Sequence, residues 1–383
     1  MDYIEVLKHL LSIDTSVPPG LNYDKVVDYL QPLFEELGFD TQRVYIPKKY
    51  AEGREGRVNL ICHRRTLGKQ RLIFYGHIDV VPAEGWDAFK PQVEKGKIYG
   101  RGAADMKGSI AALLLALETL KEKPLKYDVS VMITTDEEFG QASQLRYLER
   151  YLQPVSGAHF FNLDSSFGYV STVGLGALQV DIKVKGKSVH SALSHLGENA
   201  VEKANLLVSA LLDLKSKVVE RKSKVPVHPE TGLTNMEARL NINMIRGGLK
   251  VNIVPDECLV SIDRRLIPEE NIEDARKELM DVITSVSGVT WELERILTIP
   301  TVPPYDDPLV DDLVDIIKDT TGQGGKFGEM GSGDLPHIVA EWGGKEFGLG
   351  TIRPECNIHG KDEFVYQQDI EDLAKIIVRF LSC

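Results

Sequence analysis

Four short, mainly apolar runs in the first 164 residues constrain the fold more than any other feature of this sequence. They are VNLIC (58–62), RLIFYGH (71–77), DVSVMITT (128–135) and AHFFNLD (158–164). Such runs are typical of strands that are covered on both faces of a parallel sheet. Between the second and third runs, MKGSIAALLLALETLK (106–121) predicts a buried helix. This alternation predicts an α/β domain with a mostly parallel central sheet flanked by helices.

The pattern changes after about residue 174. LQVDIKVKGKSVH (178–190) alternates apolar and polar residues, as strands with one exposed face do, and helical patterns follow at 199–217 and 269–286. These features predict a smaller α+β domain inserted into the sequence. A proline-rich stretch then leads back to the first domain. We therefore expect one domain of residues 1–173 and 298–383 around an inserted domain of residues 174–297.

Composition excludes several classes of protein. The chain has 383 residues, with 45 Lys and Arg against 57 Asp and Glu, for a net charge of −12. This balance argues against a protein that binds nucleic acid or an anionic membrane. No apolar run is long enough to span a bilayer, and the acidic residues near the start do not suit a signal peptide. The 4 cysteines form no CxxC pair, so we expect reduced thiols in a cytoplasmic protein.

Polar side chains gather where the apolar runs end. His77 and Asp79 follow one run, the acids 136–138 follow another, and Asp164 ends a third. Ligand sites of open α/β sheets form at the carboxyl ends of strands. Because residues i and i+2 share one face of a strand, Asp79 could orient the ring of His77 toward a metal. Three adjacent acids after an apolar strand would also be stabilised by a cation.

Each of these residues also has a plainer interpretation. Asp105 in GRGAADMKG could cap a helix, the acids 136–138 could form a solvated turn, and Asp164 an Asx turn. His359 could lie on a surface loop. GRGAADMKG resembles part of a phosphate-binding loop, but it lacks the third glycine of the dinucleotide fingerprint and a following Gly-Lys-Ser/Thr. Histidines and carboxylates without cysteine suit Zn²⁺ or a similar divalent ion.

Six motifs together resemble the dizinc amidohydrolase and exopeptidase family of acetylornithine deacetylase, succinyl-diaminopimelate desuccinylase, aminoacylase and the glutamate carboxypeptidases. The motifs are GHIDVVP (76–82), GRGAADMKG (100–108), TTDEEFG (134–140), NLD (162–164), GKSVHSALSHLGENA (186–200) and IHGKDEF (358–364). Their order and spacing cover nearly the whole chain. The resemblance implies that residues 1–173 and 298–383 form a metal-binding catalytic domain, and that residues 174–297 form a lid and dimerisation domain.

The resemblance also implies a centre of two divalent metal ions, zinc or else cobalt or manganese. His77 and Asp164 would hold one ion, Glu138 and His359 the other, and Asp105 would bridge both. The peptide bond after the bridging aspartate is cis in relatives, so a cis bond is expected between Asp105 and Met106.

The same resemblance implies catalytic roles for three further residues. Glu137 would be the general base, which takes a proton from the metal-bridging water and passes it to the leaving amine. Asp79 would orient His77. His190 would reach into the active site of the partner subunit and stabilise the tetrahedral oxyanion.

Substrate-binding positions lie mostly in the second half of the chain. Asn252, Arg265, and Ser332 and Asp334 of the GSGD loop match residues that bind the substrate carboxylate or line its pocket. Strand alternation allows only one of Arg264 and Arg265 to face the site, and the Asp-x-Arg spacing favours Arg265.

We therefore expect a cytoplasmic, homodimeric, zinc-dependent hydrolase. It would cleave the amide of small N-acyl amino acids by a metal-bridging hydroxide, as acetylornithine deacetylase and succinyl-diaminopimelate desuccinylase do. A metallo-exopeptidase, either a carboxypeptidase or a dipeptidase acting on short peptides, is the alternative with the same site. In the family that the chain resembles, aspartate at position 164 is typical of aminopeptidase-like members, whereas deacetylases, desuccinylases and carboxypeptidases usually carry glutamate there. Chain length and lid pattern resemble the acetylornithine deacetylase and desuccinylase branch. A non-catalytic binding protein on the same fold is an alternative from another class, against which the intact ligand set argues.

Overall fold

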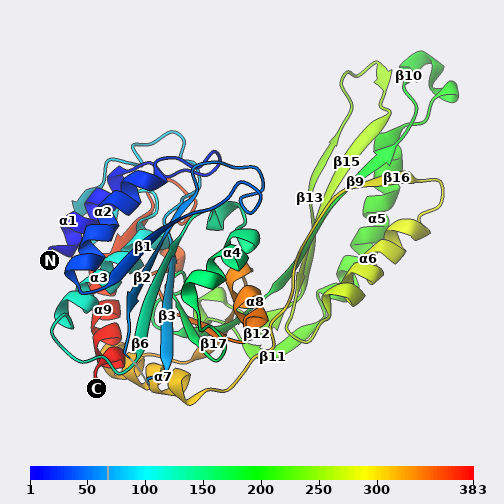
Figure 1. The fold of residues 1–383 in the computed structure, drawn as a ribbon. Helices are drawn as coiled ribbons and strands as arrows, with labels where there is room; N and C mark the ends of the chain where they lie inside the picture. Colours follow the sequence, from blue (N-terminus) through cyan, green and yellow to red (C-terminus); the bar gives the residue numbers. More distant parts are fainter. Residues whose placement is uncertain (67–68) are drawn as a thin grey trace. The chain divides into compact units, whose positions relative to one another are not determined.

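The computed structural model describes residues 1–66 and 69–383, which pack as two units (Figure 1). The first unit comprises Met1–Thr172, Tyr305–Phe327 and Asp334–Cys383, and the second comprises Val173–Pro304 and Gly328–Gly333. Relative to the expected boundaries, Val173 and residues 298–304 and 328–333 pack with the second unit. A hydrogen bond from Leu175 N to Gly331 O (2.9 Å) and a β-bridge between Val227 and Gly328 hold the latter segment there.

An eight-stranded sheet forms the centre of the first unit, with the order β1-β2-β6-β3-β7-β18-β8-β17. Strand β3 pairs in parallel with β6 and β7, and β7 pairs in parallel with β18, so the carboxyl ends of these strands meet at one edge. The pairs β1–β2, β2–β6 and β18–β8 are antiparallel. The strands are β1 (Asp40–Tyr45), β2 (Val58–Arg64), β3 (Arg71–His77), β6 (Asp128–Thr134), β7 (His159–Asn162), β8 (Val170–Gly174), β17 (Lys326–Glu329) and β18 (Lys345–Gly348).

Helices cover both faces of this sheet, which explains why its central strands are mainly apolar and buried. Leu72 and Phe74 of β3 pack into one core cluster with α1, α2, α3, α7 and α9, whereas Ile73 and Tyr75 pack into another with α4 and α8. The helices are α1 (Tyr3–Ser12), α2 (Tyr23–Glu36), α3 (Gly108–Thr119), α4 (Ala142–Leu152), α7 (Pro308–Thr321), α8 (Asp334–Glu341) and α9 (Gln367–Leu381).

A small antiparallel sheet beside them joins two distant segments. Its order is β19-β5-β4, with β4 (Gln92–Glu94), β5 (Lys97–Tyr99) and β19 (Phe364–Tyr366). The register pairs Phe364 with Tyr99. It therefore places the residues that precede Phe364 next to those that follow Tyr99.

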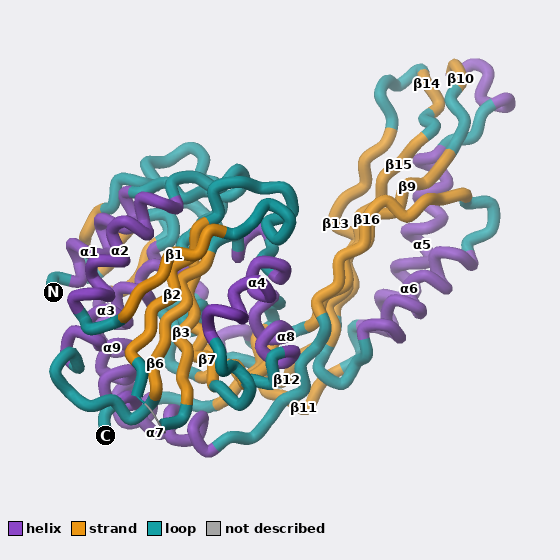
Figure 2. The backbone as a smooth tube through the Cα atoms, viewed as in Figure 1, coloured by secondary structure: helices purple, strands orange, loops and turns teal. Residues whose placement is uncertain are grey.

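The second unit is an antiparallel sheet with the order β13-β15-β9-β16 (Figure 2). Helices α5 (Ala200–Val218) and α6 (Ile272–Ser285) pack against it through a core of their own. The sheet strands are β9 (Gly176–Lys185), β13 (Arg239–Gly247), β15 (Glu257–Leu266) and β16 (Thr290–Ile299), and the short strands are β10 (Val189–His190), β11 (Lys222–Pro226), β12 (Asn235–Glu237) and β14 (Ile253–Val254).

The structure confirms the expected fold class, an α/β unit with a mostly parallel central sheet together with a separate antiparallel α+β unit. None of the helices in the described part of the chain is long and apolar enough to cross a membrane.

Candidate metal centre

Parallel pairing in the central sheet brings the predicted ligands to one edge. His77 is the last residue of β3, Glu137 and Glu138 lie in the turn after β6, and Asp164 follows β7. Asp105 lies in an irregular turn (Ala103–Lys107) immediately before α3. The peptide bond between Asp105 and Met106 is cis, as expected.

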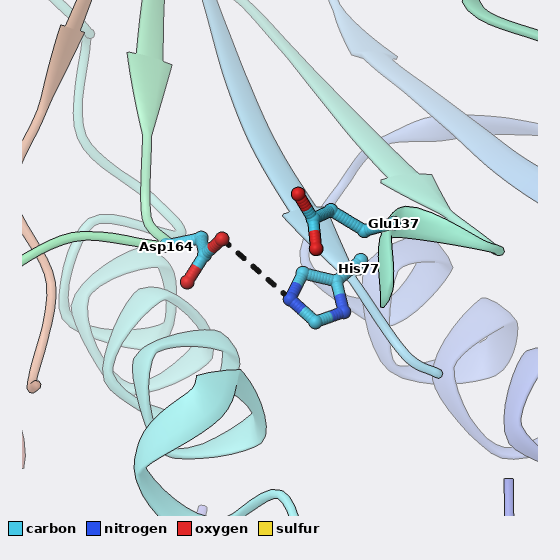
Figure 3. Close-up of side chains that lie close together, drawn as sticks. All are labelled: His77, Glu137 and Asp164. Atoms are coloured by element: carbon cyan, nitrogen blue, oxygen red, sulfur yellow. Dashed lines mark ion pairs between the residues drawn. The ribbon is translucent and has the colours of Figure 1, made fainter. Parts of the chain in front are cut away.

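Two groups of side chains could each hold a metal ion. In one group, the potential ligand atoms of His77, Glu137 and Asp164 all lie within 4.8 Å of one another. Figure 3 shows these three side chains converging, with His77 Nε2 at 3.7 Å from Asp164 Oδ2. The other group, Asp105, Glu138 and His359, meets the same distance criterion of 4.8 Å.

Asp105 connects the two groups. Its Oδ1 lies 3.2 Å from Nε2 of His77, and its Oδ2 lies 3.1 Å from Nε2 of His359. His359 Nε2 is also 3.0 Å from Oε2 of Glu138. Each carboxylate oxygen of Asp105 thus faces a histidine of a different group, the arrangement that a bridging ligand requires.

The two ring nitrogens of His77 show whether this side chain could bind a metal. Nε2 is buried and forms no hydrogen bond in the described part of the chain, although the carboxylate of Asp105 is only 3.2 Å away. Nδ1 lies 3.1 Å from the backbone oxygen of Asp79. If Nδ1 carries the proton and donates it there, Nε2 presents its lone pair to the carboxylates. Imidazole and carboxylate ligands suit a divalent ion such as zinc, so the residues fit a two-ion centre.

Asp79 holds two parts of this centre together. Its Oδ1 is 3.5 Å from Nδ1 of His77, and its Oδ2 accepts a hydrogen bond of 3.0 Å from the backbone N–H of Glu138. The residue is fully buried. His77 Nδ1 therefore contacts the backbone oxygen of Asp79, with the carboxylate farther away, and the other oxygen of that carboxylate restrains the turn after β6.

The pKa values of these side chains are shifted because several carboxylates lie close together. Burial raises the pKa of Glu137 well above its usual range, and the nearby carboxylates of Asp164 and Glu138 add to this effect. Burial also raises the pKa of Glu138. Hydrogen bonds with Asp105 and Glu138 raise the pKa of His359 to about 10. A cation bound between these carboxylates would relieve the same repulsion.

Asp136, the first acid of the triplet, points away from the two groups. It adopts a left-handed φ of 65°, and its side chain is fully buried. Its carboxylate is held by Arg57 Nε (2.9 Å), Arg54 Nε (3.1 Å), Tyr23 Oη (3.0 Å) and Gln144 Nε2 (2.7 Å). No role distinct from those of Glu137 and Glu138 was predicted for Asp136. A usable signal was the residue type, because aspartate tolerates the left-handed region better than most residues.

The loop that carries His359 has an unusual backbone. Asn357, His359 and Asp362 have φ values of 56°, 61° and 55°, in the left-handed region that non-glycine residues rarely adopt. Residues held in this region cluster at functional sites. Gly360 N donates a hydrogen bond of 2.8 Å to Asn357 O, which closes the turn.

Predicted substrate-binding residues occupy different environments. Asp334 Oδ2 accepts hydrogen bonds from the backbone N–H groups of Gln141 (2.6 Å) and Ala142 (2.9 Å), and so caps the start of α4. In the second unit, Arg265 Nη1 donates to Ser332 Oγ at 3.0 Å, and its Nε pairs with Asp263 at 2.7 Å. The adjacent Arg264 is buried against Glu270.

His190 and Asn252 lie together in the second unit. His190 pairs with Ile253, the neighbour of Asn252, where β10 meets β14. Both residues are exposed, and His190 Nδ1 accepts a hydrogen bond of 3.2 Å from Ala192 N. Asn252 O accepts one of 3.1 Å from Ser191 N. Their exposed side chains are available to a substrate or to another subunit.

Comparisons with known proteins identify a family and relatives for this chain. The family model described as peptidase family M20/M25/M40 matches residues 73–382. A succinyl-diaminopimelate desuccinylase from Thioalkalivibrio sulfidiphilus is 30% identical, over 85% of this chain and 86% of its own. Another from a Psychrobacter species is 28% identical, over 99% and 94%.

Solved structures share the fold at lower identity. An M20 family metallo-carboxypeptidase from Sulfolobus solfataricus has a TM-score of 0.81 at 18% identity, over 99% of this chain and 98% of its own. A tripeptidase from Staphylococcus aureus has a TM-score of 0.77 at 22% identity, over 99% and 96%.

Proposed function

The chain belongs to peptidase family M20/M25/M40, and from this premise we propose that it is a two-metal deacylase of N-acyl amino acids. Membership of the family makes it a metallohydrolase that acts on amide or peptide bonds. The names of the relatives, succinyl-diaminopimelate desuccinylases, support deacylation as the finer assignment. The observation that carries the proposal is the pair of ligand groups joined by Asp105.

We assign the metal ligands as the family resemblance implies. His77 and Asp164 would hold one ion, Glu138 and His359 would hold the other, and Asp105 would be a ligand of both. Two divalent ions, zinc or else cobalt or manganese, would polarise the carbonyl of the substrate and make the attacking water more acidic.

Glu137 is assigned as the general base. Its carboxylate lies with His77 and Asp164, yet in the described part of the chain it pairs with neither histidine as closely as Glu138 does with His359. The carboxylate is therefore available to accept a proton from the attacking water and to donate it to the leaving amine. Asp79 keeps the His77 ring and the Glu138 backbone in place during this transfer.

Recognition of the substrate is assigned to residues of the second unit and to the GSGD segment (331–334), which lies between β17 and the start of α8. The guanidinium of Arg265, oriented by Asp263 and Ser332, would bind the free carboxylate of the substrate. Asn252 and Asp334 would also contribute to substrate recognition, as the family resemblance implies. For Asp334 this role would be indirect, because its carboxylate caps α4.

We assign the protein as a homodimer that associates through the second unit. Strand β13 forms one edge of that sheet, and exposed apolar side chains extend along it and the turn that follows: Met244 (39%), Ile245 (53%), Leu249 (98%) and Val251 (100%). An open edge with apolar side chains favours pairing with another chain. In the dimer, His190 would stabilise the oxyanion in the partner subunit.

A cytoplasmic location is also proposed. The 4 cysteines are present as free thiols, as expected in a reducing compartment, with Cys62, Cys258 and Cys356 buried and Cys383 exposed.

A substrate panel tests the proposal against its alternative. N-acetyl and N-succinyl amino acids and dipeptides would be assayed with the metal-free protein plus Zn²⁺, Co²⁺ or Mn²⁺. We expect the acyl amino acids to be cleaved with the higher kcat/KM. Faster cleavage of dipeptides would instead identify an exopeptidase, and cleavage of neither class would identify a non-catalytic relative.

The Glu137→Gln variant tests the assignment of the base. We expect it to retain both ions and to lose about 10²–10⁴-fold in kcat, the range that a general base contributes. Turnover at the wild-type rate would show that another group moves the proton.

A further inference from the structure

The glycine-rich segment GRGAAD (100–105) binds an anion that belongs to the chain itself. Oε2 of Glu363 accepts hydrogen bonds from Gly102 N (3.0 Å) and Arg101 Nη1 (2.7 Å). Oε1 accepts from Ala104 N (3.0 Å) and Asp105 N (3.2 Å). Backbone N–H groups that converge in this way form an anion-binding concavity. The likeness to a phosphate loop therefore has a structural basis, but an internal carboxylate occupies the position of the phosphate.

Glu363 is well protected from solvent. Its side chain is 1% exposed, and the paired side chain of Arg101 is 3% exposed. A buried carboxylate with several donors restrains the groups that surround it, because each donor would lose its partner if the carboxylate moved.

The same carboxylate joins two segments that carry metal ligands. Asp105 lies at the end of the concavity, and His359 precedes Glu363 by four residues. Arg101 Nη2 also donates to Gly360 O at 3.0 Å, and Gly100 N donates to Glu363 O at 2.9 Å. Beyond this point the chain continues directly into the pairing of β19 with β5.

We propose that Glu363 is a positioning residue for the two-metal centre, because it ties segment 100–105 to segment 359–363. Through this link, the carboxylate of Asp105 faces His77 and His359 at the same time. The inference rests on the two-metal centre of the proposed function. It adds a residue that touches neither the ions nor the substrate.

A matched control is available elsewhere in the first unit. Asp307 is also a buried carboxylate, 5% exposed, with a cationic partner at Lys345 Nζ (2.6 Å) and a backbone donor at Leu309 N (3.0 Å). It also contacts His159, the first residue of β7, at the opposite end of that strand from Asp164. Loss of Asp307 should therefore cost stability without changing the metal centre.

Binding of Co²⁺ to the metal-free, full-length protein tests the proposal. Affinities would be measured by titration calorimetry, and the geometry of the ligands by the visible spectrum of bound Co²⁺. We expect Glu363→Gln to weaken the binding of at least one ion by about 10–100-fold, as is typical when a group that orients metal ligands is lost. We expect Asp307→Asn to lower the Tm while both Co²⁺ affinities stay within about twofold of wild type.

Chemical rescue provides a second measurement. In Glu363→Ala, formate or acetate should enter the vacated concavity and restore Co²⁺ affinity by about tenfold or more. Chloride at equal ionic strength should not, and the carboxylates should not strengthen binding to wild type or Asp307→Asn. If Glu363→Ala does not fold, the Co²⁺ affinities of Glu363→Gln alone test the proposal.

Two results would overturn the inference. One is wild-type Co²⁺ binding and spectrum in Glu363→Gln. The other is an equal loss of affinity in Asp307→Asn, which would reduce the effect to general destabilisation. Failure of the proposed function looks different, since wild-type protein would then bind both ions and hydrolyse no acyl amino acid.

Discussion

At the scale of single residues, three adjacent acidic side chains point in different directions. The left-handed backbone of Asp136, with a φ of 65°, makes this possible. Asp136 turns into the interior toward Arg54 and Arg57, whereas Glu138 reaches His359. A run of carboxylates that would repel one another in an ordinary turn is thus divided between an internal ion-pair cluster and the candidate metal centre.

Replacing Asp136 tests how firmly this cluster anchors the turn. Asp136→Asn keeps a side chain that tolerates the left-handed backbone, but leaves Arg57 and Arg54 without a buried counter-charge. We expect a loss of about 3–5 kcal/mol in the free energy of unfolding, measured by urea denaturation. The control Asp315→Asn removes an exposed carboxylate, 79% accessible, and should change stability by less than about 0.5 kcal/mol. Equal stability of the two variants would contradict the anchoring role.

Asp307 provides a prediction of pH dependence that does not involve the metal centre. Burial alone would raise the pKa of its carboxyl, but hydrogen bonds from Lys345 and His159 outweigh that effect and lower the pKa to about 2. A group with a lowered pKa stabilises the fold above its unfolded pKa of about 4 and loses this contribution as the pH falls toward 2. We expect Asp307 to contribute about 2 kcal/mol at pH 7.

The measurement is the difference in unfolding free energy between wild type and Asp307→Asn at several pH values. It should be constant from pH 7 to about pH 5 and then shrink as the acid range is entered. A difference that grows on acidification would show that the carboxyl is not held by these cations.

Much of the candidate centre could be anticipated from residue types at strand ends. The structure brings His77, Asp105, Glu138, Asp164 and His359 close together, and their roles as ligands remain predictions. Asp136 and Glu363 were missed because their partners are distant in sequence. Arg57 lies 79 residues from Asp136, and Gly102 lies 261 residues from Glu363. No local spacing reveals contacts of that kind.

At the scale of elements, strand β3 links the central sheet to the segment that carries Asp105. The backbone N–H of His77 donates to Met106 Sδ at 3.1 Å, and Met106 directly follows Asp105. Gly76 leaves room for this contact, because a Cβ at that position would lie 2.8 Å from Met106 Cε and 3.3 Å from its Sδ.

The substitution Gly76→Ala, in strand β3, should therefore displace Met106 and the neighbouring Asp105. The added methyl group must displace Met106 in a fully buried site, so we expect about 1–3 kcal/mol of destabilisation together with weaker metal binding. Gly325→Ala is the control, since its Cβ would make an ordinary contact of 3.5 Å with Tyr169. Thermal unfolding and Co²⁺ titration of both variants would check this, and unchanged binding in Gly76→Ala would show that Met106 moves without moving Asp105.

Elements that are buried on both sides were predictable, whereas short exposed ones were not. The run 71–77 coincides with β3, and the apolar stretch 106–121 contains α3 (Gly108–Thr119). In contrast, β4 is exposed at each of its three residues and carries no apolar signal. The order of strands in the sheet also escaped prediction, because it depends on pairing between segments far apart in the chain.

At the scale of the whole molecule, metal binding and stability should be linked. Ions that bind the folded chain but not the unfolded one stabilise it by about 2.7 kcal/mol at a hundredfold excess over Kd. We expect Co²⁺ to raise the Tm of the metal-free protein by several degrees. Asp105→Asn should reduce this rise strongly, because Asp105 faces both histidines. An undiminished rise in the variant would place the ions elsewhere.

Dimer formation through β13 can be tested by introducing one charged side chain on this strand. Ile245→Lys places an ammonium group on the exposed edge strand, and we expect it to shift the protein from dimer to monomer in light scattering coupled to gel filtration. Leu293→Lys is the control on β16, at the other edge of the same sheet, where the side chain is 41% exposed. If His190 acts across subunits, the monomer should bind both ions yet turn over poorly. A monomer with full activity would refute that arrangement.

Because the second unit is inserted in the sequence of the first, the residues of the candidate metal centre are synthesised at different times. Asp105, Glu138 and Asp164 are synthesised before the second unit, but His359 follows Glu138 by 221 residues. At roughly 5–20 residues per second, the ribosome needs on the order of 10–40 s to supply this last side chain. During that interval the nascent chain holds clustered acids without their second histidine. The complete centre is therefore a late event in the life of each molecule, and a chain that stalls within the second unit cannot form it.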